Sequence, residues 1–194
     1  MNKVTRIGNN GQEELTLNIW LGPSYDVPHL LLSFGEESAG SNRYAVVADY
    51  IPRGMTPLGS DPQYMEKYFG DDVAALWDKV YQTMEGVQPL MPPKTMSSRL
   101  LSSPARIAVS GISLADAEQV VTEHVHRFLS WLEGAQPLVA RLRGSFNTRD
   151  DKLRQFYFRG ELVRNIAELG EDLGKRVAAA NTGPVSETYV GGGS

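Results

Sequence analysis

The order of hydrophobic patterns most restricts the fold of this chain, because strand-like patterns come first and helix-like patterns follow. Leu15 to Leu21 alternate between apolar and polar side chains, with the period of two that is typical of a half-buried strand. The apolar run from Leu30 to Phe34 and the Val- and Tyr-rich segment from Arg43 to Ile51 predict two more strands. The short loop at 36–42 favours an antiparallel pairing of these two.

Helical patterns dominate the rest of the chain. Asp61 and Pro62 together form a typical helix start, and Ser113 is expected to cap a longer helix. One more strand is predicted at Ile107–Ile112. The expected helices cover 61–69, about 72–85, 114–133 and a region from near Arg149 to Ala180, interrupted around Gly170 and Gly174.

Strands followed by long helices predict an α+β fold rather than a βαβ succession. We expect a three-layer α/β/α sandwich with a central antiparallel β-sheet, although the hydrophobic pattern alone also allows two layers. The chain has 194 residues, of which 41% are hydrophobic, and this predicts a single domain over residues 1–190. The Gly-Gly-Gly-Ser segment at 191–194 is interpreted as a flexible tail.

Composition excludes several classes of function. A net charge of −4 disfavours a general nucleic-acid binder, and no apolar stretch is long enough for a membrane span. The absence of cysteine excludes disulfides and iron–sulfur clusters, so a redox centre would have to be a partner or the substrate itself. His124 and His126 are two residues apart on a predicted helix, which is the wrong spacing for one shared metal ion.

Four segments carry a resemblance to a known family. They are Asp26–Leu32, with its Pro-His pair before an apolar strand; Val46–Arg53 followed by Asp61–Tyr68; Arg99–Ala105, with an Arg before Ser-Pro; and Arg149–Arg154, with the pattern Arg-Asp-x-x-x-Arg. In this order and spacing, covering about residues 15–178, the chain resembles the red chlorophyll catabolite reductases, a branch of the ferredoxin-dependent bilin reductases.

The resemblance implies an α/β/α sandwich that holds a linear tetrapyrrole between the sheet and C-terminal helices. It implies no bound metal or flavin, with electrons arriving one at a time from reduced ferredoxin. The expected activity is reduction of red chlorophyll catabolite or of a related bilin such as biliverdin. A non-catalytic bilin carrier is the alternative. The implied location is the cytoplasm of a bacterium or the plastid stroma of a plant or alga, and a homodimer is a candidate assembly.

The resemblance also assigns the proton donors. In the family one acid lies in the Arg-Asp-x-x-x-Arg segment, and this acid corresponds to Asp150. If the alignment is shifted by one residue, the neighbouring Asp151 takes that role instead. Asp150 is also interpreted as a helix cap. The family's second acid falls at Ser33, and a serine hydroxyl is a poor proton donor. His29 lies four residues earlier on the same strand face and is a candidate replacement.

Charged residues supply the remaining candidates. Guanidinium groups bind carboxylates in bidentate fashion, so four arginines are candidates for the two bilin propionates: Arg53, Arg99, Arg154 and Arg159. Asp49 is interpreted as a fold-building residue in a salt bridge or turn. Seven basic and three acidic residues lie between Arg141 and Arg164. This local excess favours docking of an acidic ferredoxin, and an ordinary basic helix is the alternative.

Overall fold

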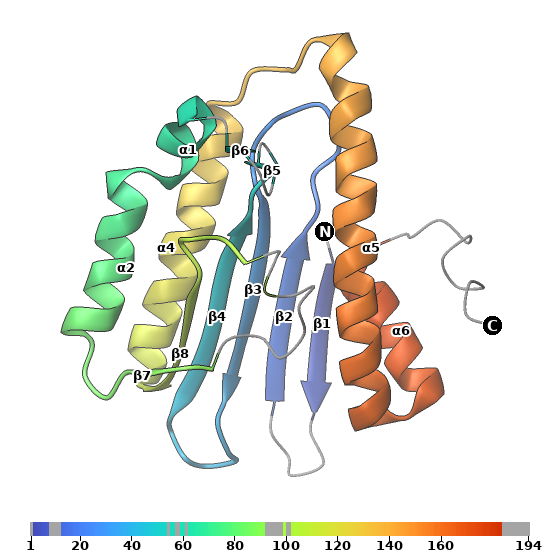
Figure 1. Cartoon of the computed structure of the whole chain (residues 1–194). Coiled ribbons are helices and arrows are strands. Elements are labelled where there is room, and N and C mark those ends of the chain that lie inside the picture. Colours follow the sequence, from blue (N-terminus) through green and yellow to red (C-terminus); the bar gives the residue numbers. More distant parts are fainter. Residues whose placement is uncertain are drawn as a thin grey trace.

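The structure is a computed structural model that describes residues 2–7, 13–53, 55–56, 59–60, 62–91, 99 and 102–183. Within these ranges one antiparallel sheet has the strand order β1-β2-β3-β4-β8-β7 (Figure 1). Its strands are β1 Asn2–Ile7, β2 Glu13–Ile19, β3 His29–Glu36, β4 Tyr44–Ile51, β7 Gln88–Pro89 and β8 Ile107–Ile112. A separate antiparallel pair joins β5 Met55–Thr56 to β6 Gly59–Ser60.

The predicted strands are confirmed as β2, β3, β4 and β8, with ends that differ from the expected ones by at most two residues. The sequence does not predict β1, which pairs with β2 along the sheet edge. It also does not predict β7, a two-residue strand that ends at Pro89 on the opposite edge. Proline has no backbone N–H, and it is tolerated there because one side of an edge strand has no neighbouring strand that needs this hydrogen-bond donor.

Alternate residues of the strands serve two different purposes. Leu30 and Leu32 on β3, with Val46 and Ala48 on β4, are at most 4% exposed and belong to the main hydrophobic core. Leu31, which pairs with Asn18 and Asp49 on the neighbouring strands, points to the opposite face. One face of the sheet therefore builds the core, and the other presents polar groups.

Helices cover both faces of the sheet (Figure 1). Helices α1 (Pro62–Phe69), α2 (Asp71–Thr83) and α4 (Leu114–Glu133) contribute Tyr68, Val80, Val120 and Phe128 to the main core. Helices α5 (Ala140–Leu169) and α6 (Glu171–Thr182) lie on the polar face. This arrangement confirms the α+β class and the three-layer sandwich with a central antiparallel sheet. The predicted cap Asp61 lies outside the described residues.

Helix α4 has the bounds that the sequence predicts, and Ser113 caps it. Ser113 Oγ accepts a hydrogen bond from the Asp116 backbone N–H at 3.2 Å and donates one to Asp116 Oδ2 at 2.7 Å. Replacing Ser113 by alanine should lower the free energy of unfolding by about 1 kcal/mol, because both groups lose their partner. Urea unfolding of the variant beside the wild-type protein measures this change, and an unchanged midpoint would contradict it.

The last helical region differs from its prediction in two ways. Helix α5 begins at Ala140 rather than near Arg149, so Asp150 lies within the helix and the interpretation of Asp150 as a helix cap is wrong. The chain turns at Gly170 (φ 81°) but not at Gly174, which lies inside α6. A Cβ atom on Gly174 would approach the backbone N of Ile166 to 2.6 Å, so glycine here lets α6 pack closely on α5.

No helix in the described part of the chain is both long enough and apolar enough to cross a membrane.

Candidate active site

A cavity of about 240 Å³ lies between the polar face of the sheet and helices α5 and α6. Strands β2, β3 and β4 form its floor, while the two helices and the segment before β8 form its walls. This is the position in which the resemblance places a pigment. The residues that line it are Glu14, Thr16, Asn18, Leu31, Leu32, Ser33, Val47, Asp49, Ile51, Ser102, Arg106, Tyr157, Glu161, Arg164 and Asn181.

Asp49 is a buried carboxyl group on the floor of this cavity. It is 5% exposed, and its Oδ1 accepts hydrogen bonds from the backbone N–H of Ser103 at 3.2 Å and from Ser103 Oγ at 2.6 Å. Burial raises the pKa of Asp49 to about 6, although the Ser103 hydrogen bonds and the charge of Arg106 act in the opposite direction. The carboxyl can therefore hold and release a proton near neutral pH. The fold-building interpretation of Asp49 accounts for its bonds to Ser103 and misses its place in the cavity.

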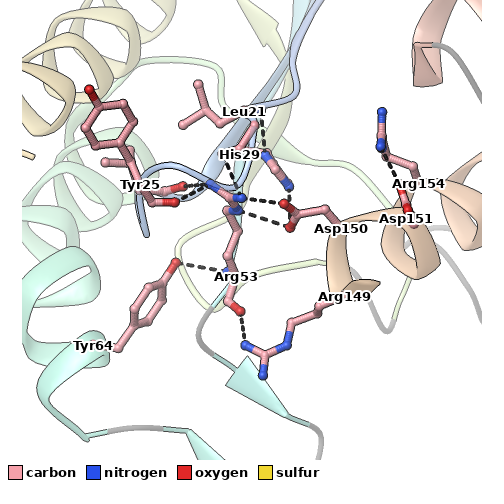
Figure 2. A network of polar contacts seen from close by, with 11 residues as sticks. Leu21, Tyr25, His29, Arg53, Tyr64, Arg149, Asp150, Asp151 and Arg154 are labelled. Atoms are coloured by element: carbon pink, nitrogen blue, oxygen red, sulfur yellow. Dashed lines mark hydrogen bonds and ion pairs between the residues drawn. The ribbon is translucent and has the colours of Figure 1, made fainter. Parts of the chain in front are cut away.

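Asp150, His29 and Arg53 form a separate buried cluster that connects α5 to the sheet (Figure 2). Asp150 accepts hydrogen bonds from His29 Nε2 at 3.2 Å, from Arg53 Nε at 3.1 Å and from Arg53 Nη2. Arg53 also donates to the backbone oxygens of Gly22 at 3.0 Å and Tyr25 at 2.6 Å. The structure thus brings together two predicted catalytic residues and one predicted propionate ligand, but none of the three lines the cavity.

The protonation states in this cluster follow from its geometry. The Leu21 backbone N–H donates to His29 Nδ1 at 3.0 Å, so the proton of a neutral imidazole sits on Nε2 and points to Asp150. Burial and the charge of Arg53 lower the pKa of His29 to about 4, despite the hydrogen bond to Asp150. Burial alone would raise the pKa of Asp150, but the hydrogen bonds and charges of His29 and Arg53 hold it below its usual value.

This cluster disfavours the proton-transfer roles proposed for its members. A neutral His29 with a lowered pKa is a poor substitute for a missing acid near neutral pH. Asp150, ionised beside Arg53, is a weaker candidate for proton donor than Asp49. The assignment of Asp150 as an acid stays a prediction, and the observed contacts favour a role in positioning α5.

Ser33 lines the cavity and has a carboxylate beside it. Its hydroxyl donates a hydrogen bond to Glu14 Oε1 at 2.6 Å. Ser33 lies opposite Thr16, and Glu14 is two residues away from Thr16 on β2, so both side chains project from the same face of the sheet. Glu14, on the neighbouring strand, therefore places a carboxyl group beside Ser33, the position at which the resemblance expects the family's second acid.

A second polar cluster closes the cavity at α5 and α6. Glu161 accepts hydrogen bonds from Arg164 at 2.8 Å and from Asn181 Nδ2 at 3.0 Å, and Asn18 Nδ2 donates to the Asn181 backbone oxygen at 2.9 Å. The Oδ1 atoms of Asn18 and Asn181 are buried and have no hydrogen-bond partner. Because unpaired buried acceptors are costly, both atoms are candidates to accept hydrogen bonds from a bound molecule. Desolvation raises the pKa of the Tyr157 hydroxyl, so it remains a donor.

None of the four predicted propionate ligands is among the residues that line the cavity. Arg53 is fully buried and donates to Asp150 and backbone oxygens, so in this structure it has no group left for a propionate. Arg154 pairs with Asp151 at 2.5 Å, and neither residue lines the cavity. Arg99 and Arg159 are exposed. The arginines that do line the cavity are Arg106 and Arg164, neither of which the sequence singles out.

The described residues contain no group of three or more His, Cys, Asp or Glu side chains that could hold a metal ion. The cavity instead offers a protonatable carboxyl, two guanidinium groups and unpaired amide oxygens, beside the apolar side chains of Leu31, Val47 and Ile51. Such a set can bind a molecule that carries carboxylates and N–H groups. It can also give that molecule a proton.

A central antiparallel sheet between helical layers, with a cavity under the C-terminal helices, is the fold that the resemblance to the bilin reductases implies. Among solved structures the chain is similar to phytochromobilin synthase from tomato in complex with biliverdin, with a TM-score of 0.68 and 18% sequence identity. The similarity covers 93% of this chain and 64% of the synthase chain, so this chain is similar to less than two thirds of that protein. At this identity the similarity establishes the fold. No protein-family model matches the chain, and no curated protein does either.

Proposed function

We propose that this protein reduces a linear tetrapyrrole with electrons from reduced ferredoxin, as a bilin reductase. The observation that carries the proposal is the buried Asp49 carboxyl on the floor of a cavity between the sheet and α5 and α6. A shared fold with a synthase solved in complex with biliverdin supports the same class of substrate. Red chlorophyll catabolite and biliverdin are the two substrates to test first.

The side chains around the cavity suit the groups that a bilin presents. A bilin carries two propionate carboxylates, and Arg106 and Arg164 are the cavity arginines that can pair with them. It also carries pyrrole N–H groups, and the unpaired Oδ1 atoms of Asn18 and Asn181 can accept from them. The substrate would then lie flat over the apolar side chains of the sheet, with its conjugated system beside Asp49.

The proposed reaction combines one-electron transfers with protonation by the protein. Each two-electron reduction of a double bond consumes two electrons and two protons, and Asp49 can supply one of these protons. Exposed basic residues on α5 would attract an acidic ferredoxin to the helix that also forms a cavity wall. They are Arg141, Arg143, Lys152 and Arg159.

Anaerobic absorbance spectra test the proposal directly. The protein is mixed with biliverdin, and separately with red chlorophyll catabolite, before and after addition of reduced ferredoxin. We expect a ferredoxin-dependent loss or blue shift of the long-wavelength band with one of the two pigments, because reduction shortens the conjugated system. Binding shifts that do not respond to ferredoxin with either pigment would contradict the enzyme and favour a bilin carrier.

A further inference from the structure

Tyr157 places a phenol side chain in the wall of the cavity that α5 forms. Within the part of the chain that the structure describes, its hydroxyl makes no hydrogen bond. Other neutral donors in the cavity differ, because the Ser33 hydroxyl and the side-chain amides of Asn18 and Asn181 donate to acceptors within the protein. The Tyr157 hydroxyl is therefore available to a bound molecule.

The surroundings of Tyr157 keep the proton on its hydroxyl. Burial raises its pKa above the ordinary value of 10.0, and the negative charge of Glu161 adds to this rise, whereas Arg164 acts in the opposite direction. The phenol thus stays neutral over the whole range in which Asp49, with a pKa of about 6, gains and loses its proton. Such a group donates a hydrogen bond but does not release its proton.

The ring of Tyr157 is fixed by its contact with Trp20. The two rings meet edge to face with their centroids 5.5 Å apart. Trp20 is itself fixed, because its Nε1 donates to the Asn181 backbone oxygen at 2.9 Å and its ring centroid lies 4.9 Å from that of His29. The Tyr157 hydroxyl is therefore held in place before a ligand binds, which favours a role at a reacting molecule.

A bilin offers this hydroxyl a matching acceptor. Its terminal rings include a lactam, whose carbonyl oxygen accepts hydrogen bonds. The proposed function pairs the propionates with Arg106 and Arg164 and the pyrrole N–H groups with asparagine oxygens, so the lactam oxygen still needs a donor. When an electron enters the conjugated system, negative charge develops on this oxygen, and a fixed donor beside it stabilises that charge.

We propose that the Tyr157 hydroxyl donates a hydrogen bond to a lactam carbonyl of the pigment and stabilises the negative charge that reduction places there. The inference rests on the proposed reduction of a bilin. The phenol keeps its proton, so each reduced double bond still takes two electrons from ferredoxin and two protons from other sources, Asp49 among them. Tyr157 thus orients a terminal ring and makes the pigment easier to reduce.

The central test compares Tyr157→Phe with the matched control Tyr25→Phe. The first variant removes the hydroxyl and keeps the ring that packs on Trp20. Tyr25 is 36% exposed and does not line the cavity, and its variant keeps the backbone oxygen to which Arg53 donates. In Tyr157→Phe we expect the reduction rate to fall by about 100-fold, the usual loss for one donor to a developing charge. Affinity for biliverdin should fall by at most about tenfold, and the control should retain both values.

Infrared spectra of bound biliverdin test the hydrogen bond without ferredoxin. A donated hydrogen bond weakens the C=O bond, so the lactam C=O stretch should lie at a lower frequency in the wild-type protein and in Tyr25→Phe than in Tyr157→Phe. An identical stretch in wild type and Tyr157→Phe would overturn the proposal, and so would an unchanged reduction rate. If the stretch shifts as expected but the wild-type protein shows no ferredoxin-dependent reduction, the hydrogen bond stands and the proposed function fails instead.

Discussion

Replacing Asp49 with asparagine is expected to lower the rate of pigment reduction by at least about 100-fold, the size of effect that one general acid usually has. Asparagine keeps the shape of the side chain and can still accept from Ser103, so pigment affinity should change by less than a factor of three. Single-turnover absorbance with reduced ferredoxin measures the rate, and absorbance titration with pigment measures the affinity.

The pH dependence gives an independent signature of the same residue. Asp49 donates only when protonated, and its pKa is about 6, so the wild-type rate should fall as pH rises through this value. The exposed residue Asp78, on the far side of the sheet, provides the matched control Asp78→Asn. An Asp49→Asn variant that keeps the wild-type rate and pH profile would exclude Asp49 as the donor.

The free energy of unfolding should also depend on pH through Asp49, and the direction of this dependence follows from the raised pKa. Burial raises the pKa of Asp49 above its ordinary value of 3.8, so the folded state binds this proton more tightly than the unfolded state. The stabilisation is therefore fully present below pH 3.8 and is lost as pH rises through about 6. An uncharged asparagine does not undergo this loss, so the stability of the variant relative to wild type should increase across this interval.

Much of the fold is predictable because the hydrophobic periodicity of its elements is strong. The alternation at 15–21 and the apolar stripe of 114–133 predict β2 and α4 with nearly correct ends. The first turns of α5 are different, because they are mostly polar and exposed, and Leu142 and Phe146 are their large apolar side chains. So few apolar residues give a weak periodic signal, and the start of the helix is predicted nine residues too late.

The site is only partly predictable from the sequence, because the burial of its side chains depends on contacts with residues that are far away in the sequence. The resemblance points to Asp150 and the strand pattern to His29, and the structure joins these two directly, while Arg53, 97 positions before Asp150, pairs with the same carboxylate. Asp49 becomes a candidate donor only when Ser103, 54 positions away, and the helical layer bury its carboxyl. No local pattern around Asp49 carries that information, so sequence reasoning leaves it as a fold-building residue.

The second large effect expected is on stability, from replacement of Asp150 with asparagine. Arg53 is 0% exposed, and within the described residues Asp150 is the carboxylate to which its guanidinium group donates hydrogen bonds. Removing one partner of a buried ion pair usually costs about 3–5 kcal/mol, because it leaves the other charge uncompensated. In a chain of this size that loss corresponds to a fall in melting temperature of roughly 10 °C.

The adjacent residue provides a matched control for this experiment. Asp151 pairs with Arg154 at a partly exposed position, so Asp151→Asn should change stability by less than about 1 kcal/mol. The lowered pKa of Asp150 also predicts how the stability difference depends on pH. The stabilisation by the ionised carboxylate is present above the ordinary pKa of 3.8 and is lost as pH falls below it. The gap in melting temperature between wild type and Asp150→Asn should therefore narrow in acid. A gap below 2 °C at pH 7 would contradict the role of the cluster as a structural connection.

The same variant separates the two roles assigned to Asp150. If Asp150 donates a proton, as the resemblance predicts, the Asn variant loses turnover even at temperatures where it is fully folded. If Asp150 instead holds α5 against the sheet through Arg53 and His29, turnover at low temperature survives and falls only as the variant unfolds. The ionised state of Asp150 beside Arg53 favours the second outcome. Proton delivery would then belong to the carboxyl groups that line the cavity.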